Sequence, residues 1–365
     1  MPNHPIHKTR LLGSGFKTWE IELYRLLDRP SAECANFMSH RQSHQQFRPS
    51  VNRGGQKHAL EDKWLMHHIT SGLGIPSPVT LGLYHPALGQ YPDGTALQRW
   101  ADFEPLFSNT PRVNWIIKPR GGRQGEAVHH FCGDHSELHA LLSSLPDTDR
   151  QYYDSAYHGY LIQQCLEQHA EIAAINPTCI NSLRVVTFCE RSGEVHVDCA
   201  IMRLGRGHSA ADNWDKGGLS VGIDLDTGQL IRGVTKPKFG GDWFDSHPDS
   251  GEPLTGRPVP FFDEARRLCT RAAKAFSGTP SIGWDIALTP NGPVLMEGNA
   301  QWDLPMVQVH STGYLTDDKR RQLKEFGVEL QADLLPATSS SLHLAAQTAR
   351  RSRAGRWWVR RTRSS

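Results

Sequence analysis

A predicted hairpin near the C-terminus constrains this chain more than any other feature. Two strand-forming segments, 283–288 and 293–299, are separated by Thr-Pro-Asn-Gly. Proline suits the first corner of a type I turn, and glycine suits the left-handed residue that follows it. We therefore predict a three-residue Pro-Asn-Gly loop that pairs Thr289 with Pro293. The two segments then become neighbours in an antiparallel sheet.

The same register predicts a patch of oxygen ligands on one face of the hairpin. It places Asp285 opposite Glu297, and Asn299 shares a face with Glu297 because side chains alternate along a strand. Two carboxylates and an amide suit Mg²⁺, which prefers oxygen ligands and keeps substrate phosphates and water as the others. Two alternatives stay open. A two-residue Asn-Gly loop would turn Asp285 to the other face, and acidic residues on a half-exposed strand are often only solvated.

The composition is that of a globular protein with a large core. The 365 residues are 38% hydrophobic and 21% charged, which suits two or three subdomains. A net charge of +2 does not point to a nucleic-acid partner. The N-terminus has no apolar secretory region, and no apolar run approaches the roughly 20 residues of a membrane span. The cysteines are scattered without a Cys-x-x-Cys pair, so we expect reduced thiols in a cytoplasmic protein.

Strands and antiparallel hairpins dominate the pattern, with a few helices, which predicts an α+β fold class without repeated βαβ units. The polar segment 31–58 is expected to be a loop or a loosely packed helix. The other expected helices are 15–29, 61–71, 134–145 and 262–276. The other expected strands are 79–84, 113–119, 127–131, 160–166, the hairpin 182–190 with 194–204, and the hairpin 219–224 with 230–234.

The composition changes after about residue 335. A serine-rich stretch is followed by arginines interleaved with Trp357 and Trp358, without an acidic residue. Such a segment is typical of a disordered, solvated tail. The alternative is a peripheral contact with anionic lipid or glycan machinery, because arginine and tryptophan together suit an interface.

The second chemical feature is the glycine-rich turn 120–126 between two predicted strands. Its Gly121, Gly122 and Gly125 would let main-chain N–H groups approach phosphates closely, and Lys118 would add a point charge. The turn is neither a Walker loop nor a Rossmann fingerprint, because no Gly-Lys-Ser/Thr follows and no helix begins at the last glycine. A purely structural turn is the alternative.

Together these motifs resemble the ATP-grasp superfamily, and most closely its sugar-transfer-associated branch, which is related to α-L-glutamate ligases. The resemblance covers about residues 60 to 315 and includes 180–187, 200–205, 211–213, 217–218, 247–248, 284–285 and 297–299. It implies an ATP-grasp fold, in which two α+β subdomains grip ATP. The expected organisation is an N-terminal helical or irregular region 1–60, a pre-grasp segment 61–112, a lid subdomain 113–166, a core subdomain 167–330 with the metal site, and a basic low-complexity tail 331–365.

The resemblance also implies roles for single residues. Lys63 and Lys118 match the two ATP lysines, Gly121, Gly122 and Gly125 the phosphate-covering loop, and Gln163, Gln164 and Leu166 the hinge that contacts adenine. The hinge commonly begins with an acid, but a glutamine amide can still accept from the adenine amino group. Glu171 would hold the ribose, and Asp285, Glu297 and Asn299 match the magnesium ligands.

Two arginines are the expected catalytic residues. Arg184 and Arg203 lie on neighbouring strands of one hairpin, and alternation could aim both into the cleft, where arginine suits carboxylate and phosphate recognition. The alternative is that one of them forms a structural ion pair. The expected substrate-side residues are Asp212, Asn213, Gly217 and Gly218, with His247 and Asp303 as weaker candidates.

The resemblance implies an ADP-forming carboxylate–amine ligase that makes a C–N bond through an acyl phosphate, acting in exopolysaccharide or sugar-conjugate biosynthesis. ATP and two Mg²⁺ ions are the expected cofactors, with Mn²⁺ as a substitute. The expected partners are a small carboxylate and an amine, one of them sugar-linked. Two alternatives stay open: an ATP-dependent phosphotransferase, and a non-catalytic nucleotide-binding scaffold tethered to a glycan-assembly complex at the inner membrane face.

Overall fold

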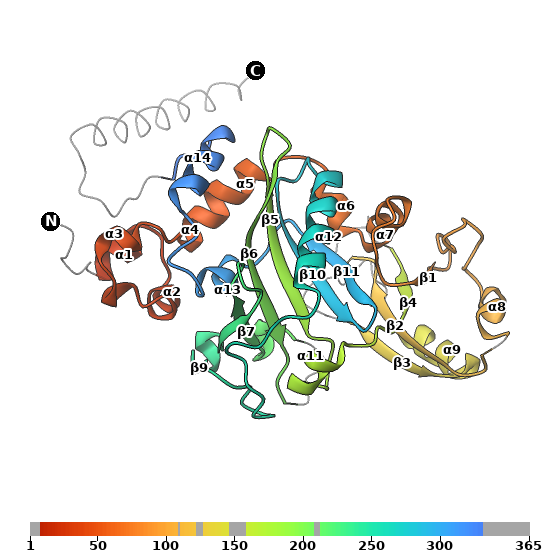
Figure 1. Ribbon diagram of the computed structural model, residues 1–365. Coiled ribbons are helices and arrows are strands. Elements are labelled where there is room, and N and C mark those ends of the chain that lie inside the picture. Colours follow the sequence, from red (N-terminus) through yellow and green to blue (C-terminus); the bar gives the residue numbers. More distant parts are fainter. Residues whose placement is uncertain (1–7, 109, 122–126, 146–157, 208–211, 331–365) are drawn as a thin grey trace, which may run out of the picture.

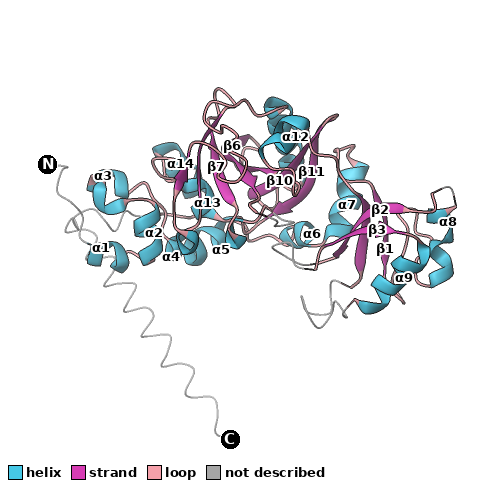
Figure 2. Ribbon diagram, turned by 90° about the horizontal axis from the view of Figure 1, so that it is seen from below, coloured by secondary structure: helices cyan, strands magenta, loops and turns pink. Residues whose placement is uncertain are grey.

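The structure is a computed structural model, and it describes residues 8–108, 110–121, 127–145, 158–207 and 212–330 (Figure 1). Gly122, Gly125 and the basic tail 331–365 lie outside the described residues. Figures 1 and 2 show a large lobe built on one sheet and a small lobe built on a second sheet at one end of the molecule. No described helix is long and apolar enough to cross a membrane.

The small lobe is a four-stranded antiparallel sheet with the order β1-β4-β2-β3. The aromatic residues Trp115 and Phe131 lie in its core, against the helices on one side of the sheet. Asp134 caps the helix after β3, as predicted, because its side chain accepts from Glu137 N and Glu137 reciprocates. The elements are β1 (Thr80–Tyr84), β2 (Val113–Pro119), β3 (His129–Gly133), β4 (Tyr160–Gln164), α8 (Glu104–Phe107) and α9 (His135–Ser144).

The large lobe contains a seven-stranded sheet with the order β11-β10-β5-β6-β7-β8-β9, and every pair in it is antiparallel. The three predicted hairpins all lie in this sheet. Its strands are β5 (Ser182–Cys189), β6 (Val195–Leu204), β7 (Leu219–Ile223), β8 (Leu230–Val234), β9 (Trp243–Phe244), β10 (Ser281–Thr289) and β11 (Gly292–Asn299).

Both faces of the large sheet are covered, which explains why β5 and β10 are buried along their whole length. Leu183 and Val185 face a core that includes the amphipathic helix α12 (Phe262–Ala275). Val186 and Phe188 face the opposite core, which includes the N-terminal helices. Because side chains alternate, Arg184 lies on the face of the N-terminal helices. Asp285 lies there too, since Trp284 and Ile286 belong to the core of α12.

The N-terminal region forms short helices, of which those before residue 43 lie at the end of the molecule opposite the small lobe, whereas those of 57–61 and 63–72 lie towards the small lobe (Figure 1). The predicted helix 15–29 is broken, because Arg25 adopts a left-handed conformation with φ 51° and a 3₁₀ turn, Leu26–Asp28, follows it. Asn52 ties this region to the large sheet by donating to the carbonyls of Ser281 and Ala300. The helices are α1 (Lys8–Gly13), α2 (Thr18–Leu23), α3 (Ser31–Cys34), α4 (His40–Gln42), the π-helical turn Ser43–Phe47, α5 (Arg48–Val51), α6 (Lys57–Glu61) and α7 (Lys63–Gly72).

Three further helices complete the large lobe. Helix α11 follows β4, whereas α13 and α14 follow the hairpin of β10 and β11. A buried ion pair holds α14 to β6, because Lys319 Nζ lies 2.7 Å from Asp198 Oδ1. The helices are α11 (Ala170–Ile175), α13 (Leu304–Gln308) and α14 (Asp317–Glu325).

Candidate active site

The hairpin of β10 and β11 has the predicted pairing of Asp285 with Glu297, but its loop differs from the predicted one and its strand contains a β-bulge. Thr289 pairs with Gly292, so the loop is the two-residue Pro-Asn, and the predicted three-residue loop is wrong. Gly292 has φ 118°, a conformation that glycine adopts without strain. That loop alone would have turned Asp285 to the other face.

A β-bulge restores the register. Leu295 pairs with Ile286, but Glu297 pairs with Asp285, so Met296 is the extra residue of the strand. A bulge reverses the face of every residue beyond it. The predicted pairing of Asp285 with Glu297 is therefore confirmed, because two one-residue shifts compensate each other.

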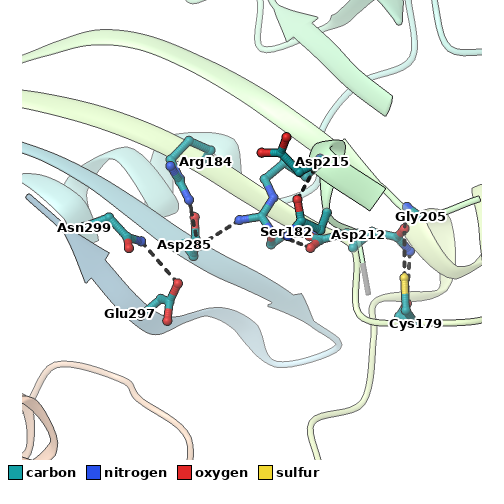
Figure 3. Close-up of polar contacts among 12 residues, drawn as sticks. Cys179, Ser182, Arg184, Gly205, Asp212, Asp215, Asp285, Glu297 and Asn299 are labelled. Carbon is teal, nitrogen blue, oxygen red and sulfur yellow. Dashed lines mark hydrogen bonds and ion pairs between the residues drawn. The ribbon is translucent and has the colours of Figure 1, made fainter. Parts of the chain in front are cut away.

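Asp285 is buried and binds two arginines, Arg184 and Arg203. Figure 3 shows Arg184 beside it. Arg184 donates from Nε to one carboxylate oxygen and from Nη2 to the other, the second bond being 2.9 Å long. Arg203 Nη1 donates to the same oxygen as Arg184 Nη2, also at 2.9 Å. Burial alone would raise the pKa of Asp285, but the charges of Arg184 and Arg203 hold it well below its usual range. The two arginines therefore favour the ionised form of Asp285.

Arg203 bridges two carboxylates and connects the hairpin to a second loop. Its Nη2 donates to Asp212 Oδ1 at 2.6 Å, while Asp212 also accepts from the backbone N of Ser182 at 2.8 Å. Burial opposes the charged form of Arg203, but Asp212 and Asp285 raise its pKa above the usual range. The Nε of Arg203 is buried and has no hydrogen-bond partner among the described residues. Arg203 lines the cleft, and two carboxylates hold its guanidinium in one orientation there.

The predicted metal ligands lie together and fit a magnesium ion. Asp285 accepts three N–H groups, and a carboxylate offers about four lone-pair sites, so one remains. Glu297 is half-buried and accepts from Asn299 Nδ2 at 3.2 Å through one oxygen only (Figure 3). The carboxylates and the amide oxygen of Asn299 form an all-oxygen donor set, which is the type that Mg²⁺ prefers.

Two lysines lie on the other side of this patch. Lys118 is on β2 and Lys63 is the first residue of α7, where its Nζ donates to the carbonyl of Gly121 at 3.3 Å. The start of α7 is fixed because Asp62 caps it and forms a 2.6 Å ion pair with Arg120. Burial and the charge of Lys63 lower the pKa of Lys118 to about 8, although Glu297 opposes the shift. Two ammonium groups this close are suited to an anion such as a polyphosphate.

A cleft of about 580 Å³ joins these groups between the two lobes. Its apolar wall includes Ile116, Leu166 and Met296, which suits the faces of a flat ring. Gln163 uses its amide nitrogen on Thr80 Oγ1 at 2.8 Å, which leaves its amide oxygen as an acceptor. The predicted residues that line the cleft are Lys63, Lys118, Gly121, Gln163, Gln164, Leu166, Arg203, Asp212, Asp285 and Glu297.

The remaining predicted residues lie elsewhere. Glu171 is exposed on α11, 3.8 Å from Arg257, and does not line the cleft. His247 is buried and its Nε2 binds the carbonyl of Gly205 at 2.9 Å, which is a structural contact. Asn213 caps a 3₁₀ turn that ends at Gly217, whose φ is 95°, and Gly218 packs against the backbone carbonyls of Leu204, Asp212 and Asn213. Asp303 lines a separate cavity.

Some residues that line the cleft were not predicted from the sequence. Asn114 and His130 line it and contact each other at 2.6 Å from opposite strands. Asn114 and Ile116 share a face with Lys118 because side chains alternate along β2. Counting back by two from Lys118 would have found both residues. Thr178 and Ile180 also line the cleft, but they come from a loop without a recognisable pattern.

The comparison with protein families decides the assignment. The family model described as sugar-transfer-associated ATP-grasp matches residues 42–321. This chain belongs to the sugar-transfer-associated ATP-grasp family. The predicted α+β ATP-grasp fold is thereby confirmed, and the cleft lies between the two lobes of that fold. No curated protein sequence matches the chain.

Several solved structures resemble parts of this ATP-grasp protein. N5-carboxyaminoimidazole ribonucleotide synthetase from Thermotoga maritima is 13% identical, with a TM-score of 0.36 over 67% of this chain and 42% of its own. Biotin carboxylase from Campylobacter jejuni is 12% identical, with a TM-score of 0.44 over 78% of this chain and 48% of its own. D-alanine–D-alanine ligase from Bacillus anthracis is 12% identical, with a TM-score of 0.35 over 81% and 69%. The chain thus spans less than half of the first two structures, and the assignment rests on the family model.

Proposed function

We propose that this protein is an ATP-dependent carboxylate–amine ligase that forms ADP and an acyl phosphate intermediate. The observation that supports this proposal is a single cleft in which two lysines, a hinge segment and the pair Asp285 and Glu297 meet. Lysines near a carboxylate pair suit the phosphates of a nucleotide and its metal. The apolar wall and the amide oxygen of Gln163 suit adenine.

In this proposal each group of the cleft has one task. Lys63 and Lys118 bind the phosphates, and Gln163 accepts from the adenine amino group. Asp285, Glu297 and Asn299 would hold magnesium, which neutralises charge on the β- and γ-phosphates when bound. The cleft lies between the lobes, so a nucleotide bound in it is surrounded by protein and shielded from water.

Arg203 is the residue best placed to orient the acceptor carboxylate. It lines the cleft, and Asp285 and Asp212 hold its Nη1 and Nη2, so the guanidinium has one orientation there. In the reaction a carboxylate oxygen attacks the γ-phosphorus, the bond to ADP breaks, and an acyl phosphate forms. The amine nitrogen then attacks the carbonyl carbon, phosphate leaves, and the nitrogen loses its extra proton. Arg203 would stabilise the charge on the transferred group throughout.

The experiment that tests this function measures ADP and phosphate release with Mg-ATP. The full chain is assayed over pools of amino acids, sugar acids, amino sugars and nucleotide sugars, which also addresses the expected role in polysaccharide or sugar-conjugate synthesis. Release that requires one carboxylate and one amine together supports the ligase. ADP formed with a single acceptor, without release of phosphate, would replace the ligase by a phosphotransferase. Glu297→Ala is the control for ATP turnover by a contaminating enzyme.

A further inference from the structure

The tip of the β5–β6 hairpin carries two carboxylates and an imidazole on one face. Glu194 and His196 flank the first residue of β6, so strand alternation puts them on the same face. Glu190 follows β5 and is opposite Glu194, because its backbone N donates to the carbonyl of Glu194 at 2.8 Å. Residues opposite each other in an antiparallel pair share a face. One ligand atom of each of the three residues lies within 4.8 Å of those of the other two.

This face of the hairpin packs against α14, and both lie on the same side of the large lobe (Figure 1). Phe188, which pairs with His196, shares a hydrophobic core with Leu323 of α14. Gln322 of α14 donates from Nε2 to Glu190 Oε1 at 2.8 Å across 132 residues of sequence. The amide of Gln322 therefore lies at the edge of the cluster.

Two buried polar atoms at the cluster lack a hydrogen bond. His196 Nε2 lies 2.9 Å from Glu190 Oε1, but it forms no hydrogen bond with any described residue, so this contact does not have hydrogen-bond geometry. Gln322 is 8% exposed, and its Oε1 has no donor among the described residues. Buried polar atoms normally have partners. A bound species that takes a lone pair from the imidazole and offers a donor to the amide would satisfy both atoms.

A hydrated metal ion has both properties. The ion takes the lone pair of His196 Nε2, and a water bound to the ion donates to Gln322 Oε1. Two ligands that are each about 2.0–2.2 Å from one ion lie about 3 Å from each other. His196 Nε2 and Glu190 Oε1, at 2.9 Å, have that separation. Glu194 Oε1 is 3.8 Å from the same nitrogen, and its side chain is 67% exposed and free to rotate into place.

Neighbouring cations leave the two carboxylates available. No lysine or arginine in the described part of the chain forms an ion pair with Glu190 or Glu194, whose charged contact is His196. Lys319 is one turn from Gln322 on α14, but its ammonium binds Asp198 at 2.7 Å. The cluster therefore keeps negative charge for a metal ion.

The ligand types select the ion. One imidazole with two carboxylates suits Zn²⁺, whereas Mg²⁺ prefers oxygen ligands alone. We propose that Glu190, Glu194 and His196 bind a zinc ion, with Gln322 hydrogen-bonded to a ligand and to a metal-bound water. The ion fastens the hairpin tip to α14. It is separate from the proposed magnesium site, because Glu190 follows Arg184 by six residues of extended chain, or roughly 20 Å.

The test is a calorimetric titration of the full chain with Zn²⁺, after dialysis against a chelator and in an excess of Mg²⁺. We expect one equivalent of zinc to bind. His196→Gln and Glu190→Gln should each weaken the binding of this equivalent by at least about 10-fold. Gln322→Met keeps the length of the side chain without the amide, and it should weaken zinc binding by about 10- to 100-fold.

His58→Gln is the matched control, because His58 also lies beside a glutamate, 3.5 Å from Glu61, but outside the cluster. It should keep the zinc equivalent, although other histidines and cysteines of the chain also bind zinc weakly. Thermal melts give a second readout. Zinc should raise the Tm of the unmodified protein and of His58→Gln, but not that of His196→Gln, because a ligand stabilises only the fold that binds it.

The proposal is overturned if no zinc equivalent is found, if magnesium displaces it, or if His196→Gln and Glu190→Gln bind zinc like the unmodified protein. Equal loss in His58→Gln would overturn it as well. Melts without zinc show whether each variant is folded, and the exposed Glu194→Gln decides the matter if a less exposed variant is not. These readouts do not require ATP turnover, so the failure of the ligase function would leave the zinc site standing, and the reverse.

Discussion

Arg184 and Asp285 face each other directly across β5 and β10, and the guanidinium binds both oxygens of the carboxylate. Both side chains are buried, with 7% and 4% of their surface exposed. A bidentate arginine holds the carboxylate in one orientation, so the lone pair that remains on Asp285 points in a fixed direction. Of the two roles open to Arg184, a structural ion pair is the one that the geometry favours, whereas Arg203 reaches the cleft.

Asp285→Asn should strongly destabilise the protein, because it leaves Arg184 and Arg203 buried beside a neutral amide. Removing one partner of a buried ion pair typically lowers the free energy of unfolding by about 3–5 kcal/mol. Chemical denaturation of the variant and of the unmodified protein measures the difference. A variant as stable as the unmodified protein would contradict the view that this carboxylate neutralises both arginines.

Glu297→Ala should reduce ATP turnover strongly and stability only a little. Glu297 is half-buried and accepts one hydrogen bond from Asn299, so its loss should change the free energy of unfolding much less than Asp285→Asn. Turnover of ATP should fall by a factor of roughly 100–1000 or more, since a group that binds the metal acts on the transition state. Steady-state kinetics beside a thermal melt separates the two effects. Retained turnover would remove Glu297 from the proposed metal site.

The two carboxylates illustrate how far the sequence predicts this site. Strand alternation identified Asp285, Glu297 and Asn299 as one patch, and the strands of the large sheet except β9 were predicted at nearly their observed bounds. The bulge at Met296 could not be predicted, because a bulge is stabilised by its neighbours in the sheet and leaves no local signal. The loop is one residue shorter than predicted and the bulge adds one residue, so the pairing of Asp285 with Glu297 is unchanged.

The cavity that Glu20 and Asp303 line was not predicted from the sequence, for a different reason. Glu20 and Asp303 are separated by most of the chain, and their meeting depends on how short helices pack onto the sheet. Polar segments such as 31–58 have weak periodicity, so their packing is decided by tertiary contacts like that of Asn52 with Ser281 and Ala300. Buried carboxylates in such a segment become recognisable only when the fold is known.

Lys118 should make nucleotide binding depend on pH. Its pKa is about 8 in the empty cleft, and the phosphates of ATP would raise it because they favour the charged ammonium. Binding at pH 8 to 9 should therefore take up a proton, and affinity should decrease as the pH rises above about 8. Calorimetry in two buffers of different ionisation enthalpy measures the uptake. Lys118→Arg should bind without uptake in this range, because arginine does not deprotonate. Equal heats in both buffers for the unmodified protein would contradict the role of Lys118.

Glu20→Gln should make the protein more stable near neutral pH, because the carboxylate of Glu20 is buried. The pKa of Glu20 is about 7 in the folded protein and 4.5 ordinarily, so between these values the folded state holds a proton that the unfolded state has released. Stability from this group is thus fully present below pH 4.5 and is lost as the pH rises to about 7. Glutamine does not titrate, so the advantage of the variant should grow from pH 5 to pH 8, reaching on the order of 1–3 kcal/mol. Urea denaturation at both pH values measures it, with Glu22→Gln as the control. An advantage that shrinks with rising pH would contradict the raised pKa of the buried Glu20.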